Sequence, residues 1–497
     1  MEAADNFWVS LFSKRYFRIG TLIAIAVISF LMHFNHFSKE LISIHVWRQT
    51  QTQSNIVNFY EEDMNILNPR RNDRGNGDGI FRMEFPLMQW LVACSYHIFG
   101  NSVLITRIIM FLTGLLSVLG MYYLLKNIFN QESAALLGAW AFNFSPCFYY
   151  YTINPLPDNM ALCCAIWGLS FFFLWYQNKK VSKLILSGLF LSIAALCKLP
   201  FILYFIVPII FLAQNIFKNG VTRSLWLQGI AVFSWGIFPL AWYAVVIPQW
   251  YGNSIVSGML DNQDSIWSLI DYLHHNLIST LPELLLNYGS LPFFIAGFYF
   301  LYQKKSYRDE KFLMLLGLST MVLIYFLFEL NAIQKIHDYY LFPFFPLLFM
   351  LVAYGGYQLL CSKQSYIQYF SVFLLLILPI TCYLRMQYRW DLNEPGFNPD
   401  WLIYKNELRE IAPKNTLVVA GNDNSHFIMF YYIDKKGWGF QENNLTPAQL
   451  SSMISLGAEY LYTDSADMVS QNSLTQYIDK LLLERGSVRV YRLKKAI

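Results

Sequence analysis

Long apolar segments recur along most of the chain, and they constrain its fold more than any other feature. An α-helix needs about 20 apolar residues to cross the hydrocarbon core of a bilayer. Segments of about this length lie near residues 18–37, 103–125, 133–151, 159–177, 225–247, 288–303, 312–330, 339–360 and 366–386. Because backbone polar groups in lipid must be paired within the protein, these segments predict membrane-spanning helices.

The composition points to lipid as the main solvent of the chain. Of its 497 residues, 56% are hydrophobic and only 14% are charged, which excludes an ordinary soluble protein. The seven cysteines all fall in or beside apolar segments without a CxxC pair, so we expect small core residues. The first apolar segment follows Lys14, Arg15 and Arg18 but lacks a small-residue cleavage site, which indicates a retained span.

One apolar stretch, residues 183–215, is interrupted by Lys198 and Pro200. Basic residues precede it (Lys179, Lys180, Lys183) and follow it (Lys218, Arg223), and such residues favour the cytoplasmic side of a membrane. Both ends of the stretch therefore belong on that side, which predicts two short spans that meet outside near Lys198. The chain then has about eleven spans, with its N-terminus in the cytoplasm and its C-terminus outside.

The loops of this topology differ in kind between the two sides. Each predicted cytoplasmic loop contains basic residues: Lys126; Lys179 and Lys180; Lys218 and Arg223; Lys304, Lys305, Arg308 and Lys311; and Lys363. The predicted outer loops cover residues 38–102, the surroundings of Asp158, residues 248–287 and residues 331–337. Because binding and catalytic residues concentrate on loops, we expect function on the outer face.

Residues 38–102 and the C-terminal region have their own patterns. Residues 45–61 and 84–99 have helical apolar spacing but insufficient length to span, so we expect helices lying in the membrane interface. The sequence between them at residues 68–79 predicts a polar loop. The composition divides the chain into a transmembrane domain, residues 1–387, and an outer domain, residues 388–497.

The C-terminal region predicts a small soluble α/β domain. Its expected strands are residues 416–420, 458–463 and 488–492, and its expected helices are residues 402–411, 447–455 and 473–485. It contains neither a GxGxxG sequence nor a P-loop, so it carries no nucleotide-binding signal.

Ionisable residues near the outer ends of spans are candidates for function, because charge at membrane depth is costly. The string HVWRQTQT, residues 45–52, places His45, Arg48 and Gln49 on one short segment. Its alternative role is an interfacial anchor whose polar groups reach toward water. Lys198 ends a short span, where it either reaches toward water or binds a phosphate.

Two acids lie beside prolines at the start of apolar helices. Glu84 belongs to MEFPLMQW, residues 83–90, and Asp158 belongs to NPLPDNMAL, residues 154–162. Either carboxylate is placed to cap its helix through backbone N–H groups, and either is a candidate catalytic base. The sequence alone leaves both roles open.

A fifth string, QKIHDYY, lies at the mouth of a predicted span. It brings a cation, an imidazole and phenols to one helix end, a combination suited to a phosphate or diphosphate headgroup. The candidate binding residues there are Lys335, His337, Asp338, Tyr339 and Tyr340.

These strings, in this order, resemble the GT-C fold membrane glycosyltransferases, in particular the protein mannosyltransferase and aminoarabinose transferase branch. The resemblance covers residues 18–386, and three strings resemble a bacterial branch most: HVWRQTQTQSNIVNFYEEDMNILNPR, EFPLMQWLVACSYHIFG and HDYYLFPFFPLL. It implies transfer of a sugar from a polyprenyl-phosphate donor to a lipid, glycan or protein acceptor at the outer face of a bacterial inner membrane. Nucleic acid is not an expected partner.

The resemblance also implies two outer acids, of which Asp158 matches the second. The sequence departs at the first, because the family's aspartate falls at or near His45 and no Asp lies between residues 38 and 62. His45, Glu84 and Asp158 are therefore all candidates for the base. No cofactor is required if cations stabilise the leaving phosphate, and a role for a divalent metal stays open.

Two other classes of function compete with this interpretation. A transporter or flippase of lipid-linked sugars also places polar groups within spans, but such proteins often carry inverted repeats, and the sequence shows no repeat. A membrane scaffold that only presents the C-terminal domain would not need polar strings in the outer loops.

Overall fold

The computed structural model describes residues 7–75, 77–250, 257–305, 308–465 and 467–494. By internal contacts the chain divides into two units. The first, here called the helical unit, comprises Met1–Phe37, Met83–Phe85 and Arg107–Met386. The second, here called the mixed unit, comprises Ser38–Arg82, Pro86–Thr106 and Gln387–Ile497.

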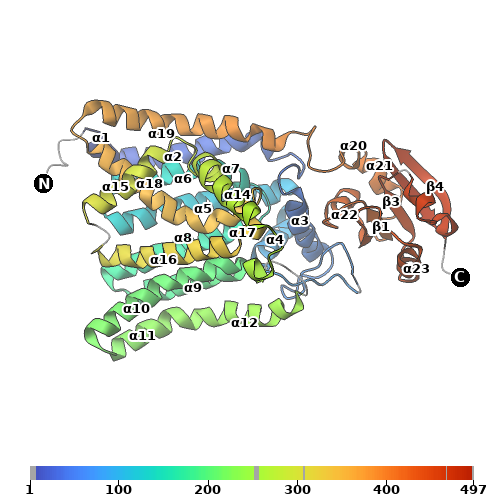
Figure 1. Ribbon diagram of the computed structural model, residues 1–497, viewed down its shortest axis with the longest axis horizontal. Helices are drawn as coiled ribbons and strands as arrows, with labels where there is room; N and C mark the ends of the chain where they lie inside the picture. Colours follow the sequence, from blue (N-terminus) through green and yellow to red (C-terminus); the bar gives the residue numbers. More distant parts are fainter. Residues whose placement is uncertain (1–6, 76, 251–256, 306–307, 466, 495–497) are drawn as a thin grey trace. The chain divides into compact units, whose positions relative to one another are not determined.

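Nearly all secondary structure of the helical unit is helix (Figure 1). Its first half contains α1 (Phe7–Ser13), α2 (Arg15–His33), α5 (Val103–Phe129, of which the part from Arg107 on belongs to this unit), α6 (Glu132–Asn143), α7 (Pro146–Thr152), α8 (Pro157–Asn178), α9 (Val181–Cys197), η2 (Leu199–Phe205) and α10 (Ile206–Asn219). Its second half contains α11 (Arg223–Phe233), α12 (Ile237–Val246), η5 (Gly258–Asp261), α14 (Ile266–His275), η6 (Asn276–Leu285), α15 (Leu291–Gln303), α16 (Glu310–Phe328), α17 (Leu330–Ile333), η8 (Asp338–Phe344), α18 (Phe345–Leu360) and α19 (Ser365–Met386).

The apolar segments of the sequence form helices, which confirms a polytopic helical membrane protein. Within the described residues, eight helices are long and apolar enough to cross a membrane. Two further apolar helices, Val181–Cys197 and Leu291–Gln303, are shorter. The segment predicted at 133–151 is broken into α6 and α7 around Ser145, which precedes Pro146. The total of eleven spans stays a prediction.

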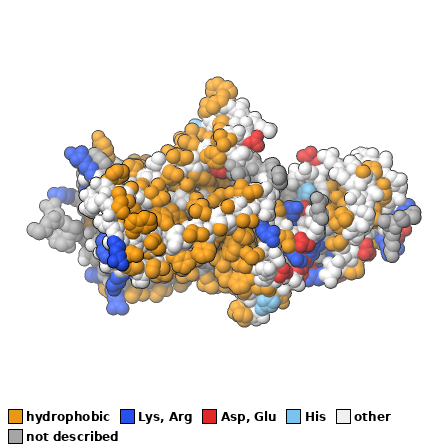
Figure 2. All heavy atoms as spheres, turned by 90° about the horizontal axis from the view of Figure 1, so that it is seen from below, with side chains coloured by type: hydrophobic (Ala, Val, Ile, Leu, Met, Phe, Trp, Pro, Cys, Tyr) orange, Lys and Arg blue, Asp and Glu red, His pale blue; other side chains and the backbone are white. Residues whose placement is uncertain are grey.

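The surface of the helical unit suits a bilayer. Hydrophobic side chains cover most of its visible flank, and Lys and Arg side chains gather at one end (Figure 2). Lys218, Lys304 and Lys363, from three of the predicted cytoplasmic loops, are all exposed. Apolar flanks with basic ends are typical of membrane-embedded helix bundles.

The mixed unit contains a five-stranded sheet of order β2-β1-β3-β5-β4. β1 pairs in parallel with β2 and β3, and β5 pairs antiparallel with β3 and β4. The strands are β1 (Leu417–Gly421), β2 (Lys436–Gly439), β3 (Tyr460–Thr463), β4 (Ile478–Arg485) and β5 (Val488–Leu493). The helices are α3 (Val46–Glu61), α4 (Leu87–Phe99), α20 (Asp400–Ile403), α21 (Lys405–Glu410), α22 (Ile428–Ile433), α23 (Pro447–Ser455) and α24 (Met468–Gln471).

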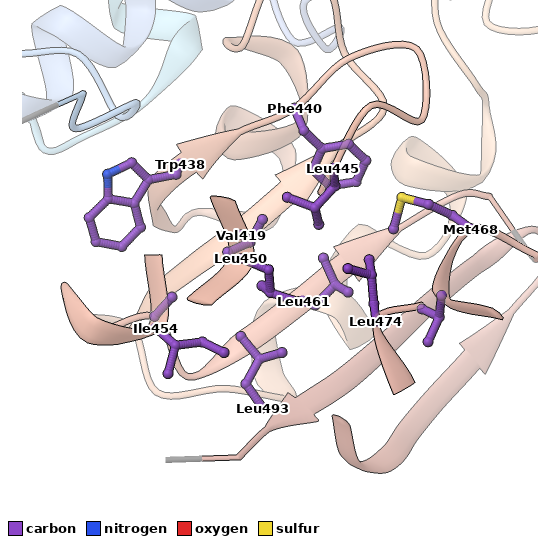
Figure 3. Packing of buried hydrophobic residues seen from close by; sticks show 12 residues of the cluster. Val419, Trp438, Phe440, Leu445, Leu450, Ile454, Leu461, Met468, Leu474 and Leu493 are labelled. Carbon is purple, nitrogen blue, oxygen red and sulfur yellow. The ribbon is translucent and has the colours of Figure 1, made fainter. Parts of the chain in front are cut away.

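One face of this sheet buries a compact apolar cluster. Val419 of β1 and Leu461 of β3 pack with Leu450 and Ile454 of α23 (Figure 3). The helix begins with a capping box, in which Thr446 and Gln449 satisfy each other's backbone N–H groups. The small α/β domain predicted from the sequence is thereby confirmed.

One expected element of this domain is wrong. Residues 473–485 form no long helix; residues 478–485 are the edge strand β4, which forms a hairpin with β5. The turn contains Gly486 in the left-handed region, with a φ of 56°, where glycine carries no Cβ penalty. The run of three leucines at 481–483 suits either a helix face or a strand, and only the pairing with β5 decides between them.

The polar loop at residues 68–79 lies along strand β2. Arg74 N donates to Gly437 O at 2.7 Å, and Gly437 N donates to Asn72 O at 3.0 Å. Trp438 adds a bond from its indole N–H to Gly75 O at 2.8 Å. Residues 38–82 and 86–106 therefore belong to the same contact unit as residues 387–497, and the division by composition into 1–387 and 388–497 stays a prediction.

Charged side chains strengthen this contact. Glu62 accepts hydrogen bonds from Arg70 at 3.1 Å, from Arg74 at 2.6 Å and from Lys436. Although burial opposes its charge, the bonds from Arg74 and Lys436 hold the pKa of Glu62 at about 2. The carboxylate is therefore ionised at any physiological pH, and it joins residues separated by more than 300 positions in the chain.

Candidate active site

The centre of the site is a break in the helical unit at Lys198. Lys198 ends α9 and precedes η2, with an extended backbone at φ −156° and ψ 116°. Pro200 explains the break, because proline has no N–H to donate to the carbonyl four residues earlier, that of Leu196. The two short segments predicted to meet at Lys198 are thus present.

The freed carbonyl of Leu196 gains other partners. It accepts hydrogen bonds from Phe85 N at 2.9 Å and from the Tyr243 hydroxyl at 3.0 Å. Trp242 donates its indole N–H to Met83 O at 3.0 Å, and its ring meets that of Phe85 edge to face. The short segment that carries Glu84 is therefore fixed against α12 and the end of α9.

Lys198 forms an ion pair with Asp158. Its Nζ lies 3.3 Å from Asp158 Oδ1, and the Asp158 side chain is only 2% exposed. The other oxygen, Oδ2, is buried and has no hydrogen-bond partner among the described residues. A buried carboxylate oxygen without a donor is costly, so this atom is available to a ligand.

Asp158 does not cap its helix. The N-cap of α8 is Leu156, without a side-chain hydrogen bond, and Pro157 takes the first helical position. Glu84 does not cap its helix either, because α4 begins after Pro86 and has no side-chain cap. These observations favour roles other than capping for both acids.

Two aromatic rings complete the surroundings of Lys198. Its ammonium lies 5.6 Å from the ring centre of Tyr339 and 5.3 Å from that of Tyr340. Tyr340 is held by its carbonyl, which accepts a hydrogen bond from the Tyr325 hydroxyl of α16 at 3.3 Å. Such cation–π contacts orient the Lys198 ammonium within the site.

Glu84 lies near this pair. The carboxylates of both Glu84 and Asp158 act electrostatically on the Cys197 thiol and on the Tyr243 phenol. The structure thus brings Glu84, Asp158 and Lys198 to the same end of α9.

The string at residues 334–340 separates into groups with different surroundings. His337 Nδ1–H donates to Ala332 O at 2.7 Å, and burial lowers the pKa of this imidazole below 6.5, so it is neutral at pH 7. Asp338 is buried and accepts a 2.5 Å hydrogen bond from the Tyr151 hydroxyl. Lys335 is 42% exposed and pairs with Asp271 at 2.5 Å.

Sequence reasoning missed one acid, Glu329, at the end of α16. Its side chain is buried, with the residue 7% exposed, and Oε2 has no hydrogen-bond partner among the described residues. The signal in the sequence was a lone acid within the apolar run YFLFEL, which the rule for ionisable groups at membrane depth would have selected.

His45, Arg48 and Gln49 belong to the mixed unit. His45 precedes α3 with a φ of 56°, a left-handed conformation uncommon outside glycine. Gln49 Nε2 donates to Ile44 O at 3.0 Å, and Arg48 donates to Gln51. All three side chains are buried rather than turned toward a membrane surface.

Within the part of the chain that the structure describes, no group of three or more His, Cys, Asp or Glu side chains is close enough to hold a metal ion.

Comparisons with known proteins agree with this architecture. Residues 84–243 match the model of the dolichyl-phosphate-mannose-protein mannosyltransferase family. Comparison with curated protein sequences finds no match. Among solved structures, ArnT from Cupriavidus metallidurans bound to undecaprenyl phosphate is similar, with a TM-score of 0.65, 13% identity and coverage of 98% of both chains.

A second solved structure extends the similarity beyond bacteria. The archaeal oligosaccharyltransferase AglB from Archaeoglobus fulgidus, in complex with an inhibitory peptide and a dolichol-phosphate, has a TM-score of 0.59 and 13% identity. The match covers 94% of this chain and 73% of AglB. Because ArnT and AglB are both GT-C glycosyltransferases, the chain has the GT-C fold, and its residues 84–243 carry the pattern of the mannosyltransferase family.

Proposed function

We propose that this protein is a membrane glycosyltransferase that moves a sugar from a polyprenyl-phosphate donor to an acceptor hydroxyl at the outer face. The observation that carries the proposal is the buried Asp158–Lys198 pair, with one carboxylate oxygen unpartnered and an ammonium held by two tyrosine rings. Two similar structures support the donor class, since one contains undecaprenyl phosphate and the other a dolichol-phosphate.

The proposed reaction is a single displacement. The acceptor oxygen attacks the anomeric carbon of the sugar, and the bond between that carbon and the phosphate oxygen breaks. The acceptor proton passes to a carboxylate, and the lipid phosphate leaves with the bonding electrons. Displacement from the opposite side inverts the anomeric configuration.

The residues at the end of α9 suit the two charge changes of this reaction. Asp158 and Glu84 are the carboxylates available to accept the proton, and His45 remains a candidate on sequence grounds alone. Lys198 is placed to stabilise the charge that develops on the leaving phosphate. An ammonium group donates hydrogen bonds, which suits it to phosphate oxygens.

A flippase of lipid-linked sugars is not favoured. Such a protein needs a route across the membrane lined by polar groups, whereas the charged residues found here gather at the break beside Lys198. The family match over residues 84–243 also favours transfer over transport.

The finer assignments belong to the same proposal. We place the protein in a bacterial inner membrane, with residues 38–102 and 388–497 outside, and we assign a lipid, glycan or protein as acceptor. The bacterial origin of ArnT and the acceptor peptide in another AglB structure support these assignments by similarity.

The test of function is donor consumption. Purified protein in lipid nanodiscs is incubated with a panel of polyprenyl-phosphate sugars, and release of polyprenyl phosphate is measured with and without candidate acceptors. Transfer should need both substrates. Movement of an intact lipid-linked sugar between the leaflets of proteoliposomes, without release of lipid phosphate, would instead identify a flippase.

Topology gives a separate prediction. In a variant without native cysteines, Lys304→Cys and Lys363→Cys should react with a membrane-impermeant maleimide only after permeabilisation, because both positions lie in predicted cytoplasmic loops. Asp78→Cys and Lys480→Cys should react in intact cells. All four positions are exposed, so access to solvent does not differ between the sets. Strong labelling of Lys304→Cys in intact cells would contradict the eleven-span topology.

A further inference from the structure

Lys198 is surrounded by side chains from two separate segments of the helical unit. Its ammonium lies 3.3 Å from Asp158 of α8, and 5.6 and 5.3 Å from the ring centres of Tyr339 and Tyr340 of η8. A lysine has a flexible four-carbon stem, so these contacts by themselves do not fix α8 relative to η8. A more rigid link between the two segments is needed to hold the ammonium in one place.

Tyr151, near the end of α7, is hydrogen-bonded to both segments. Its carbonyl accepts a hydrogen bond from Asn159 Nδ2 at 2.6 Å, and Asn159 directly follows Asp158 in α8. Its hydroxyl donates to Asp338 Oδ1 at 2.5 Å, and Asp338 directly precedes Tyr339 in η8. The two hydrogen bonds therefore join the carboxylate side of the site to its tyrosine side.

Packing makes this link rigid. Tyr151 is fully buried, and its ring meets that of Tyr339 edge to face, with 5.7 Å between the ring centres, and that of Phe342 at 5.8 Å. A packed phenol has only two side-chain torsions, so it transmits a displacement at one end to the other. The contacts form a closed ring through Asp158, Asn159, Tyr151, Asp338, Tyr339 and Lys198.

We propose that Tyr151 is a positioning residue whose hydroxyl holds Asp338, and with it the rings of η8, so that the Lys198 ammonium faces the lipid phosphate. The inference rests on the proposed function, since it concerns the phosphate that Lys198 is assigned to bind. Tyr151 itself does not touch that phosphate. Because it acts through Lys198, its effect on binding should disappear when the ammonium is removed.

The experiment measures the Kd of undecaprenyl phosphate for the full-length protein in detergent. Tyr151→Phe removes only the hydroxyl, and it should raise this Kd by about 3-fold to 30-fold, the range that a cation–π contact contributes to binding. The same change in a Lys198→Gln background should alter Kd by less than about twofold. A residue with a merely structural role would weaken binding equally in both backgrounds.

Tyr462→Phe is the matched control. Tyr462 of β3 is also fully buried, and its hydroxyl donates to Leu408 O at 3.2 Å. Both tyrosine changes remove one buried hydrogen bond, so both should lower Tm. Only Tyr151→Phe should weaken binding of the lipid phosphate, which separates positioning of Lys198 from a general loss of stability.

Asp338→Asn tests the same hydrogen bond from its other end and does not require Tyr151→Phe to fold. The amide keeps an oxygen that accepts from the Tyr151 hydroxyl, but the bond loses its charge, and charge-assisted bonds are about twice as strong as neutral ones. Kd should therefore rise by less than in Tyr151→Phe, and again only while Lys198 is present.

The outcomes separate this inference from the proposed function. Equal effects of these changes with and without the Lys198 ammonium, or an unchanged Kd while the ammonium is present, would overturn the role of Tyr151 alone. Failure of undecaprenyl phosphate to bind to the wild type would overturn the proposed function.

Discussion

Replacing Asp158 by asparagine is expected to lower kcat by about 10² to 10⁴, the usual contribution of a general base. The substitution keeps the shape of the side chain but removes its ability to accept a proton. Binding of the donor should change little, because Lys198 stays beside its two tyrosine rings. The measurement is the rate of polyprenyl phosphate release at saturating donor, with Kd for the donor determined separately.

Two further variants decide whether the lower kcat of Asp158→Asn comes from the loss of a catalytic base. Asp423→Asn is the matched control, because Asp423 is a buried acid that accepts backbone N–H groups of Phe427 at 3.0 Å and Ile428 at 2.7 Å. Its loss should reduce thermal stability but not kcat. If Asp158→Asn keeps near wild-type turnover while Glu84→Gln loses it, Glu84 is the base and Asp158 only holds Lys198.

His45 is tested by its own pH profile. An imidazole base titrates between pH 5 and 8, so His45→Asn should remove a limb of the kcat profile in that range if His45 accepts the proton. We expect no such change, because two carboxylates already lie at the end of α9. Turnover near wild type from pH 5 to pH 8 would leave His45 a structural residue at the start of α3.

Replacing Lys198 by glutamine is expected to weaken donor binding by about 10-fold to 150-fold. Hydrogen bonds to charged groups contribute about 1.5–3 kcal/mol, and each 1.4 kcal/mol corresponds to tenfold in Kd. The change also leaves Asp158 buried without its cation, so thermal stability should fall as well. Isothermal titration with undecaprenyl phosphate measures the first effect, and a thermal melt measures the second.

The control for Lys198 is a lysine with no role near the site. Lys304 is exposed and donates to Gln358 at 2.6 Å, so Lys304→Gln should leave both Kd and stability near wild type. Lys198→Gln with unchanged Kd for the lipid phosphate would show that the ammonium serves only to neutralise Asp158. The leaving phosphate would then need another cation.

Hydropathy predicted the helices of this protein because a bilayer imposes a minimum length and an apolar surface on each of them. It also located the break at Lys198, since a proline and a lysine interrupt one apolar run and the flanking basic residues fix its ends on one side. The candidate residues followed from the same rule, as Asp158 and Lys198 are charges at the ends of spans.

The pairing of those residues could not be predicted. Asp158 and Lys198 are 40 positions apart, and nothing local to either indicates the 3.3 Å contact. Glu329 was missed because an acid at the end of an apolar segment looks like the ordinary end of a membrane span. The edge strand at 478–485 was mistaken for a helix because its pairing with β5 is a tertiary contact. The secondary-structure propensities of the residues do not include such contacts.

The hydrogen bonds between the first long loop and strand β2 determine when this part of the protein can fold during its synthesis. Gly75 and Trp438 are separated by 363 positions, so the loop is synthesised long before its partner exists. At about 5–20 residues per second, a ribosome needs about 20 to 70 seconds to make the intervening chain. During that interval Glu62 and its arginines lack Lys436 and the backbone of β2, which leaves the loop open to proteases and chaperones until nearly the whole protein has been made.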